Sequence, residues 1–367
     1  MPLLSPWRQG HYDACRAVSS WYSEVVSNGS NESSGALKMV TCGKCKSKTF
    51  IPATMEPFAT VACGKCGHPL MLPVMMHNFE LRTVVASGGM GTVFTAFDTK
   101  LEREVALKMM KREVASDPEI MQAFYREARA SASLNHTNII HIYSFDEYEG
   151  QPYLVMELAN CGSVDGRIEK EQRMPEIDVL DVGIKMASAL DAALKHNLLH
   201  RDIKPGNILY NADGEPKLID FGLACGAEDQ QGGSGEDFVW GTPYYVAPEK
   251  IERKGETFLS DMYSLGGTLY HALTGHVPFE APTIEELVEA HVYTPLTPPN
   301  QVVTDISERT SQAIQKAMAK DPAERFQTYD EFRWTLEQAR SYVLVQKVQH
   351  DSMPDDEKSS GLSWWKR

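Results

Sequence analysis

The sequence predicts an α+β protein with two lobes, a β-rich lobe followed by a helical lobe, and a small cysteine module ahead of both. Short β-rich runs separated by turn residues, "FELRTVVA", "TVFTAFD" and "EVALKMM", indicate an antiparallel sheet after His77. Apolar residues at helical spacing dominate after Pro175. Two copies of "CGKC" precede these patterns. We expect a cleft where the β-rich and helical parts join.

Composition and charge exclude several classes of protein. The chain has 367 residues, of which 42% are hydrophobic, which is enough for a sizeable core. Its formal net charge of -14 opposes bulk attraction to nucleic acid or to an anionic membrane, so an anionic substrate needs a focused positive site. No window approaches the apolar length of a membrane span, and the first residues lack a basic start followed by an apolar run. We therefore expect a cytoplasmic protein without a membrane span.

The pattern changes along the chain predict four parts. Residues 27–35 are small and polar without periodicity, which is typical of a linker, and the C-terminal segment is acidic until Trp364 and Trp365. The predicted parts are an N-terminal helix and flexible linker at 1–36, a zinc-ribbon-like module at 37–73, a large domain at 77–339, and a helix extension with an acidic disordered tail at 340–367.

The cysteine module combines two close pairs of thiols. The four residues are Cys42, Cys45, Cys63 and Cys66. Paired spacing of this kind in a chain expected to be cytosolic indicates metal binding instead of disulfides. Four thiolates around tetrahedral zinc form a closed structural site, and the pattern resembles a zinc ribbon over about Thr41 to Leu72. The alternative is four reduced cysteines without metal. Because so small a module has little core, we expect zinc to fold it.

The cysteine module is basic although the whole chain is acidic. Five lysines against Glu56 give it a local charge of five minus one, or +4: Lys38, Lys44, Lys46, Lys48 and Lys65. Two partners fit that charge, nucleic acid or an acidic protein surface, which could belong to the following domain. We favour protein docking because Phe50 and Phe58 are the only aromatic candidates for base stacking, so nucleic acid is the less favoured partner.

Phosphate-binding features begin with "VVASGGMGTVF", in which three glycines lie between two β-rich runs. Glycine lets the backbone approach phosphate oxygens closely, although an ordinary glycine-rich hairpin explains the glycines equally well. Lys108 follows on the next predicted strand, where its ammonium could neutralise two bridging phosphates. Glu127, on a predicted helix, could hold that lysine in place.

The stretch "HRDIKPGNIL" supplies the chemistry of phosphoryl transfer. Asp202 can accept the proton of an attacking hydroxyl, Lys204 can hold the moving phosphoryl group, and Asn207 can bind a divalent cation through its amide oxygen. Asp220 in "LIDFGLA" offers a second oxygen ligand. Hard oxygen ligands of this type select magnesium over zinc.

In this order, "SGGMGTVF", "HRDIKPGNIL" and "GTPYYVAPE" resemble the eukaryotic-like (bacterial Hanks-type) serine/threonine protein kinase family over about His77 to Ala339. The resemblance implies the two-lobed protein kinase fold and an ATP:protein phosphotransferase acting in intracellular signalling. It implies ATP and Mg²⁺ (or Mn²⁺) as cofactors and a protein substrate with a serine or threonine hydroxyl. The residues at two positions, Lys204 and Thr242, match the pattern of the serine/threonine branch, and tyrosine kinases differ from that pattern at both positions.

The resemblance also implies roles for single residues. Asp202 would orient and deprotonate the substrate hydroxyl, Lys108 would bind the α and β phosphates and pair with Glu127, and Asn207 and Asp220 would hold magnesium. The implied nucleotide-binding residues are Ser87, Gly88, Gly89, Met90, Gly91, Val93, Ala106, Lys108, Met156, Glu157, Ala159 and Leu209. Two implied contacts are structural: Glu249 with Arg325, and Asp261 with the catalytic loop.

The sequence departs from the family pattern at the first glycine of the loop, which is Ala86 here. We expect a stiffer loop and weaker nucleotide binding. Lys108, Asp202 and Asp220 are all present, which favours an active enzyme over the alternative of a pseudokinase-like nucleotide-binding scaffold acting through its zinc ribbon and tail.

A second departure concerns activation. In the family that the sequence resembles, the arginine at the position of Arg201 usually pairs with a phosphate on the activation segment. Here Ser234 is the only hydroxyl residue between Gly222 and Thr242. Either phospho-Ser234 or a carboxylate, Glu236 or Asp237, would pair with Arg201. The alternative is a segment that is simply solvated.

Overall fold

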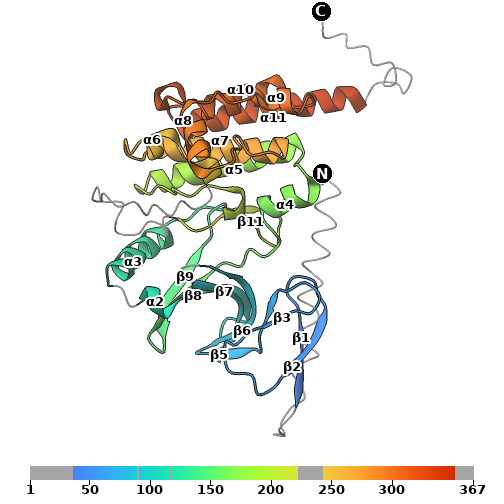
Figure 1. Cartoon of the computed structure of the whole chain (residues 1–367), viewed down its shortest axis with the longest axis vertical. Coiled ribbons are helices and arrows are strands. Elements are labelled where there is room, and N and C mark those ends of the chain that lie inside the picture. The colour runs from blue at the N-terminus through green and yellow to red at the C-terminus, as the bar shows by residue number, and fades with distance from the viewer. Residues whose placement is uncertain (1–35, 89–90, 116–117, 222–242, 352–367) are drawn as a thin grey trace, which may run out of the picture. The chain divides into compact units, whose positions relative to one another are not determined.

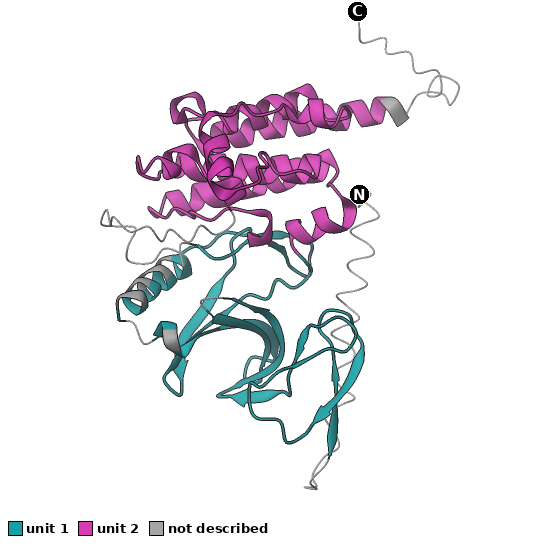
Figure 2. Ribbon diagram, in the orientation of Figure 1, with its two compact units in different colours: residues 1–162, 209–234 teal, residues 163–208, 235–367 magenta. Residues whose placement is uncertain are grey.

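The structure is a computed structural model, and it describes residues 36–88, 91–115, 118–221 and 243–351. The predicted N-terminal helix, Ser234 with its acidic neighbours, Thr242 and the Trp364–Trp365 tail lie outside the described residues. The chain divides into two compact units (Figure 2). Unit 1 comprises Met1–Gly162 and Leu209–Ser234, and unit 2 comprises Ser163–Ile208 and Gly235–Arg367.

Unit 1 contains a six-stranded antiparallel sheet in the order β5-β6-β7-β8-β10-β9 (Figure 1). Its strands are β5 (Val74–Met76), β6 (Phe79–Ser87), β7 (Gly91–Asp98), β8 (Arg103–Met110), β9 (Ile142–Tyr148) and β10 (Gln151–Met156). The three predicted β-rich runs are β6, β7 and β8. Helices α2 (Arg112–Ala115) and α3 (Pro118–Ala132) follow β8. β11 (Ile208–Tyr210) and β12 (Pro216–Leu218) form a separate hairpin, and an isolated bridge joins Leu218 to Ile139 in the segment before β9.

The register of the sheet assigns its two faces. Val93 and Leu154 lie opposite Lys108 on either side, and Met156 lies opposite Ala106. Because opposite residues share a face and successive residues alternate, all five belong to one face. The other face is an apolar cluster that includes Phe94, Ala96, Val105, Leu107, Met109, Tyr153 and Val155. The sheet thus separates a face that carries Lys108 from a face on which an apolar cluster is packed.

The cysteine module, residues 37–73, also belongs to unit 1 and is built from two small hairpins (blue in Figure 1). These are β1 (Leu37–Thr41) with β2 (Lys48–Pro52), and β3 (Val61–Ala62) with β4 (Pro69–Leu70). The two CGKC turns repeat the same hydrogen bonds: Lys46 N donates to Cys42 O at 3.0 Å, and Gly67 N donates to Cys63 O at 2.8 Å. The repeated sequence therefore folds into a repeated turn.

Unit 2 is helical. Its helices are α4 (Val164–Glu171), α5 (Glu176–Leu194), α6 (Pro248–Ile251), α7 (Phe258–Thr274), α8 (Ile284–Tyr293), α9 (Pro299–Val302), α10 (Glu308–Ala317) and α11 (Tyr329–Asp351). The apolar residues at helical spacing after Pro175 correspond to helices that include α5, α7 and α11. These helices pack tightly at Gly183, where a β-carbon would lie 2.8 Å from a methyl group of Leu269 and 3.0 Å from one of Leu336. A larger residue there would separate the helices.

Helix α7 positions the predicted catalytic loop, so its start has to be well defined. Thr257 and Ser260 form a capping box at the start of the helix. The Thr257 side chain accepts a hydrogen bond from the backbone of the first turn, and the Ser260 side chain accepts one from the backbone amide of Thr257. Asp261 follows in that first turn. Among the described residues, no helix combines the length and the apolar character needed to cross a membrane.

Candidate active site and candidate metal centre

The predicted catalytic loop is fixed by a buried carboxylate. Asp261, only 3% exposed, accepts from the backbone amides of His200 and Arg201, both at 2.7 Å. Arg201 has a φ of +68°, a conformation that costs energy for a residue with a β-carbon, and the two strong hydrogen bonds stabilise it. Burial raises the pKa of Asp261, although His200 and the two amides favour the carboxylate. The predicted contact between Asp261 and this loop is confirmed.

Asp202 is the centre of a small hydrogen-bond network in unit 2. Lys204 Nζ donates to Asp202 Oδ2 at 2.7 Å, and Asn207 Nδ2 donates to the same oxygen at 2.9 Å and to the Asp202 carbonyl at 2.7 Å. Pro205–Asn207 form a 3-10 turn that brings the amide of Asn207 back to the loop. Since its nitrogen faces Asp202, Asn207 has its side-chain oxygen to offer a cation. Three predicted site residues are therefore brought together.

Two further predicted residues meet in unit 1. Lys108 Nζ on β8 lies 2.6 Å from Asp220 Oδ1, which follows β12. An ammonium beside a carboxylate at this distance suits a site that handles phosphates and a cation together. Glu127 occupies a position on α3, but its side chain lies outside the described part of the chain, so its predicted pairing with Lys108 stays a prediction.

The predicted phosphate loop connects β6 to β7. Gly88 N donates to Gly91 O at 2.9 Å, and the hydroxyls of Ser87 and Thr92 lie 3.2 Å apart. A β-carbon at Gly91 would collide with the carbonyl oxygen of Met109 on β8, so this position requires glycine for close strand packing as well. Gly89 and Met90 lie outside the described residues.

The predicted adenine-contacting residues lie on neighbouring elements of unit 1. Val93, Ala106 and Met156 share the face of Lys108, Ala159 follows β10, and Leu209 lies on β11. The amide of Cys161 donates to Tyr210 O at 3.0 Å, which holds β11 beside the segment after β10. The role of these residues in nucleotide binding stays a prediction.

Glu157 has a role that the sequence analysis missed. Its amide donates to His141 O at 2.8 Å, and its carboxylate lies 2.6 Å from Nζ of Lys217, a lysine only 7% exposed. The buried ion pair ties β12 to the segment after β10. A lysine within the apolar run "PKLID" was the available signal, because a buried lysine requires a partner.

The four cysteines of the module form a compact cluster. Their sulfurs all lie within 4.8 Å of one another, with Cys42 Sγ 3.6 Å from Cys66 Sγ and Cys45 Sγ 3.7 Å from Cys63 Sγ. Sulfurs at the corners of a tetrahedron, each about 2.3 Å from a central zinc, would be about 3.8 Å apart. Hydrogen bonds from the Ser47 hydroxyl, and from the amides of Lys65 and Cys66, lower the pKa of Cys63 to about 5, whereas burial and the neighbouring cysteines raise the pKa of Cys66 to about 11. The donor set and its spacing fit one zinc ion.

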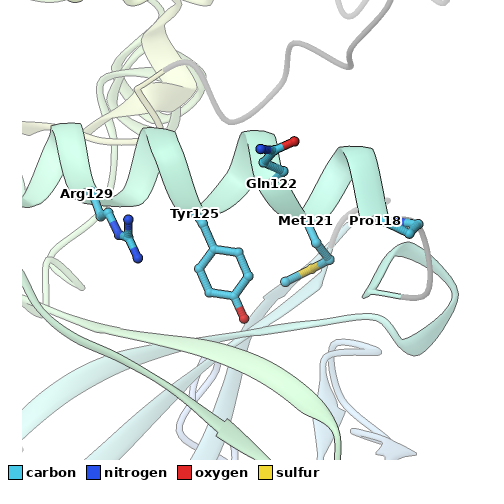
Figure 3. Close-up of a pocket in the computed structure, with 5 residues that line it drawn as sticks. All are labelled: Pro118, Met121, Gln122, Tyr125 and Arg129. Atoms are coloured by element: carbon cyan, nitrogen blue, oxygen red, sulfur yellow. The ribbon is translucent and has the colours of Figure 1, made fainter.

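A separate hollow of about 660 Å³ lies along α3 (Figure 3). Its lining residues are Pro118, Met121, Gln122, Tyr125 and Arg129. The ring of Tyr125 packs edge-on against Phe145 of β9, with the ring centroids 4.6 Å apart. None of these residues belongs to the predicted nucleotide-binding set, so this hollow is a different surface feature.

The fold and these motifs define a protein kinase. Residues 79–335 match the family model described as the protein kinase domain, and the chain belongs to that family. It is 33% identical over 264 residues to a probable serine/threonine-protein kinase of Clostridium perfringens, covering 72% of this chain and 38% of that protein. It is 34% identical over 262 residues to the serine/threonine-protein kinase PknB of Mycobacterium leprae, covering 70% and 42%.

The structural comparison gives the same fold. The kinase domain of Mycobacterium tuberculosis PknI superimposes with a TM-score of 0.57 at 24% sequence identity, covering 74% of this chain and 99% of that one. The predicted protein kinase fold, with a β-rich part and a helical part, is therefore confirmed. The chain spans less than half the length of the curated relatives named above.

Proposed function

We propose that this chain is a serine/threonine protein kinase that transfers the γ-phosphoryl group of ATP to a protein hydroxyl with magnesium. The observation that carries the proposal is the network of Asp202, Lys204 and Asn207, held by Asp261. The network supports the proposal because Asp202 can accept a proton, Lys204 can bind the moving phosphoryl group and Asn207 can offer an oxygen ligand, all from one short loop. The serine/threonine kinases among the relatives support the same activity.

The proposed reaction balances with these groups. The substrate hydroxyl oxygen forms a bond to the γ-phosphorus as the bond from that phosphorus to the bridging oxygen of ADP breaks. Asp202 accepts the hydroxyl proton, and Lys204 donates to the transferring phosphoryl group. Lys108 would bind the α and β phosphates. Asn207 and Asp220 would hold magnesium, which neutralises phosphate charge when bound.

We also propose that the four cysteines hold one structural zinc ion. The support for zinc is the spacing of the four sulfurs. Four thiolates fill the coordination shell of zinc and leave no position for a reacting water, so the proposed role is structural. The metal then has a folding role, because the module's buried cluster consists of Cys42, Cys63 and Leu70 with only Cys45 and Val61 packed on it.

Labelled phosphoryl transfer by the purified chain tests the proposed activity. With magnesium, and with itself and a generic basic protein as acceptors, the wild type should incorporate label. Asp202→Ala should reduce kcat by about 10²–10⁴ because the proton acceptor is lost, and should change the affinity for ATP much less, although Lys204 and Asn207 also lose their acceptor. Asp305→Ala, which removes an exposed aspartate in unit 2, is the matched control and should retain full activity.

The result that contradicts the proposal is equal labelling by wild type and Asp202→Ala, or none by a folded wild type that binds Mg·ATP. Asp220→Ala separates the metal role from the base. It should abolish magnesium-dependent turnover, and it should weaken Mg·ATP binding more than Asp202→Ala does.

A further inference from the structure

The cysteine module covers the apolar face of the kinase sheet. Met71, 1% exposed, belongs to the same buried cluster as Phe94, Leu107 and Val155, and Met55 and Phe58 pack against that cluster. The rings of Phe58 and Phe94 meet edge-on with centroids 6.3 Å apart. The module therefore packs on the face of β7, β8 and β10 that is opposite to Lys108, Ala106 and Met156.

A hydrogen bond from the module reaches the strand that enters the phosphate loop. His68 lies two residues after Cys66, and its Nε2 donates to the carbonyl oxygen of Val84 on β6 at 2.9 Å. The first CGKC turn lies against the same place, because a β-carbon at Gly43 would be 3.5 Å from His68 Nε2 and 3.7 Å from Thr83 Oγ1. Both cysteine turns are thus close to Thr83 and Val84.

This part of β6 is where the sheet's own pairing is irregular. The register between β6 and β7 shifts between Leu81 and Thr83 and again between Val84 and Ala86. A register shift interrupts the ladder and leaves the strand less firmly held by its neighbour. Ser87 and Gly88 of the predicted phosphate loop follow within four residues. The hydrogen bond from His68 to Val84 therefore stabilises β6 where its pairing with β7 is interrupted.

We propose that the metal-loaded cysteine module positions the phosphate loop from behind the sheet, with His68 as the positioning residue, so that metal occupancy sets the affinity for ATP. The inference rests on the proposed kinase function only for the identity of the nucleotide. The physical link is short: the amide of Cys63 donates to the carbonyl of His68 at 2.8 Å, so the turn that presents a metal ligand also places the imidazole.

Loss of the metal breaks this link. The module buries few apolar groups of its own, and four cysteine side chains without an ion do not hold two turns together. Without the turns, His68 no longer reaches Val84, and Phe58 and Met71 lose their positions on the cluster. The strand pair β6 and β7 then becomes more mobile, and ordering it on phosphate binding costs more free energy.

Hydrogen exchange of the full chain tests the mechanical part of this inference. Removal of zinc with a zinc-selective chelator should raise amide exchange in peptides covering β6 and β7, in addition to the module itself, and leave α5 and α7 unchanged. Unchanged exchange in β6 and β7 after the module has opened would overturn the inference. This readout does not depend on catalysis, so it is separate from any failure of the proposed activity.

Nucleotide affinity of single variants tests the role of His68. His68→Ala should keep one zinc per chain and weaken Mg·ATP binding roughly fivefold with kcat little changed, since one hydrogen bond is lost. His68→Gln, whose amide can donate to Val84, should restore most of the affinity. His77→Ala is the matched control, because His77 Nε2 also lies near a backbone carbonyl, that of Glu147 at 3.3 Å.

The outcomes separate clearly. A zinc-loaded His68→Ala protein that binds Mg·ATP as tightly as the wild type overturns the role of His68. Phe58→Ala should weaken binding through the lost apolar contact with Phe94, and tight binding by both variants overturns the inference as a whole. A wild type that shows this coupling without transferring phosphate refutes the proposed function and leaves the inference standing.

Discussion

The catalytic loop and the cysteine module are held in place by different means. The backbone of the loop is bound by the buried carboxylate of Asp261, and in the same helical unit the buried pair of Glu249 and Arg325 makes two hydrogen bonds of 2.7 Å. The module has a buried cluster of only a few side chains beside its four thiols. A large core can support buried charges, whereas a module of about forty residues needs a metal.

Removing the metal should give the largest effect, confined to one side of this comparison. Cys63→Ser should lower zinc content from one ion per chain to near zero and open residues 37–73 to proteolysis, because structural zinc contributes on the order of 10 kcal/mol to such modules. The unfolding of unit 2 should be little changed. Lys65→Ala, between the second pair of cysteines, is the control and should keep its zinc. Full zinc content in Cys63→Ser would contradict the four-thiolate site.

Breaking the buried ion pair should affect the other side. Arg325→Ala leaves Glu249 buried without its partner and should lower the free energy of unfolding by about 3–5 kcal/mol. Arg333→Ala removes an exposed pair with Asp330 of similar length, 2.8 Å, and should cost at most about 1 kcal/mol. Urea unfolding of both variants measures the difference, and equal losses would show that burial does not decide the strength of these pairs.

A smaller loss of stability, with a larger loss of activity, is expected at the loop itself. Asp261→Asn replaces one accepting oxygen with a donor that faces an amide, so it should destabilise the protein by about 1–3 kcal/mol. Because the loop backbone then moves, kcat should fall more than the KM for ATP changes. Asp305→Asn on the surface should alter neither. Normal kcat in Asp261→Asn would mean that the loop holds its geometry without this carboxylate.

The smallest effect concerns pH. Burial raises the pKa of Glu249, but the hydrogen bonds and charge of Arg325 outweigh burial, so the pKa lies below its usual value of 4.5. The stabilisation is therefore fully present above pH 4.5 and is lost as the pH falls through the lower value of the folded protein. The gap in unfolding free energy between wild type and Arg325→Ala should narrow over that acidic range. If the difference in unfolding free energy between the two proteins stayed constant down to pH 3, the pair with Arg325 would not be what lowers the pKa of Glu249.

Much of unit 2 and of the sheet could be predicted from sequence because periodicity and motif order report local structure. The strands β6, β7 and β8, the helices α5, α7 and α11, and the pairing of Glu249 with Arg325 are confirmed. The docking of the module through Met71 and His68 could not be derived. A methionine or histidine in a turn carries no signal for which distant strand it contacts, and that choice depends on which apolar face remains uncovered.

The predicted site shows the same limit. Asp202, Lys204 and Asn207 come together because they are close in sequence within one turn. The contact of Lys108 with Asp220 spans 112 residues and depends on the whole of unit 1. The family resemblance suggested both residues, but spacing alone could not have paired them.

The most direct test of the central claim is the chemical identity of the phosphorylated product. Zinc-loaded wild-type protein, incubated with γ-labelled ATP, magnesium and a generic basic protein, should yield phosphoserine or phosphothreonine, and the Asp202→Ala protein should yield almost none. Label on tyrosine alone, or no label from wild-type protein that binds Mg·ATP, would contradict the account of a serine/threonine kinase that uses Asp202 as its base.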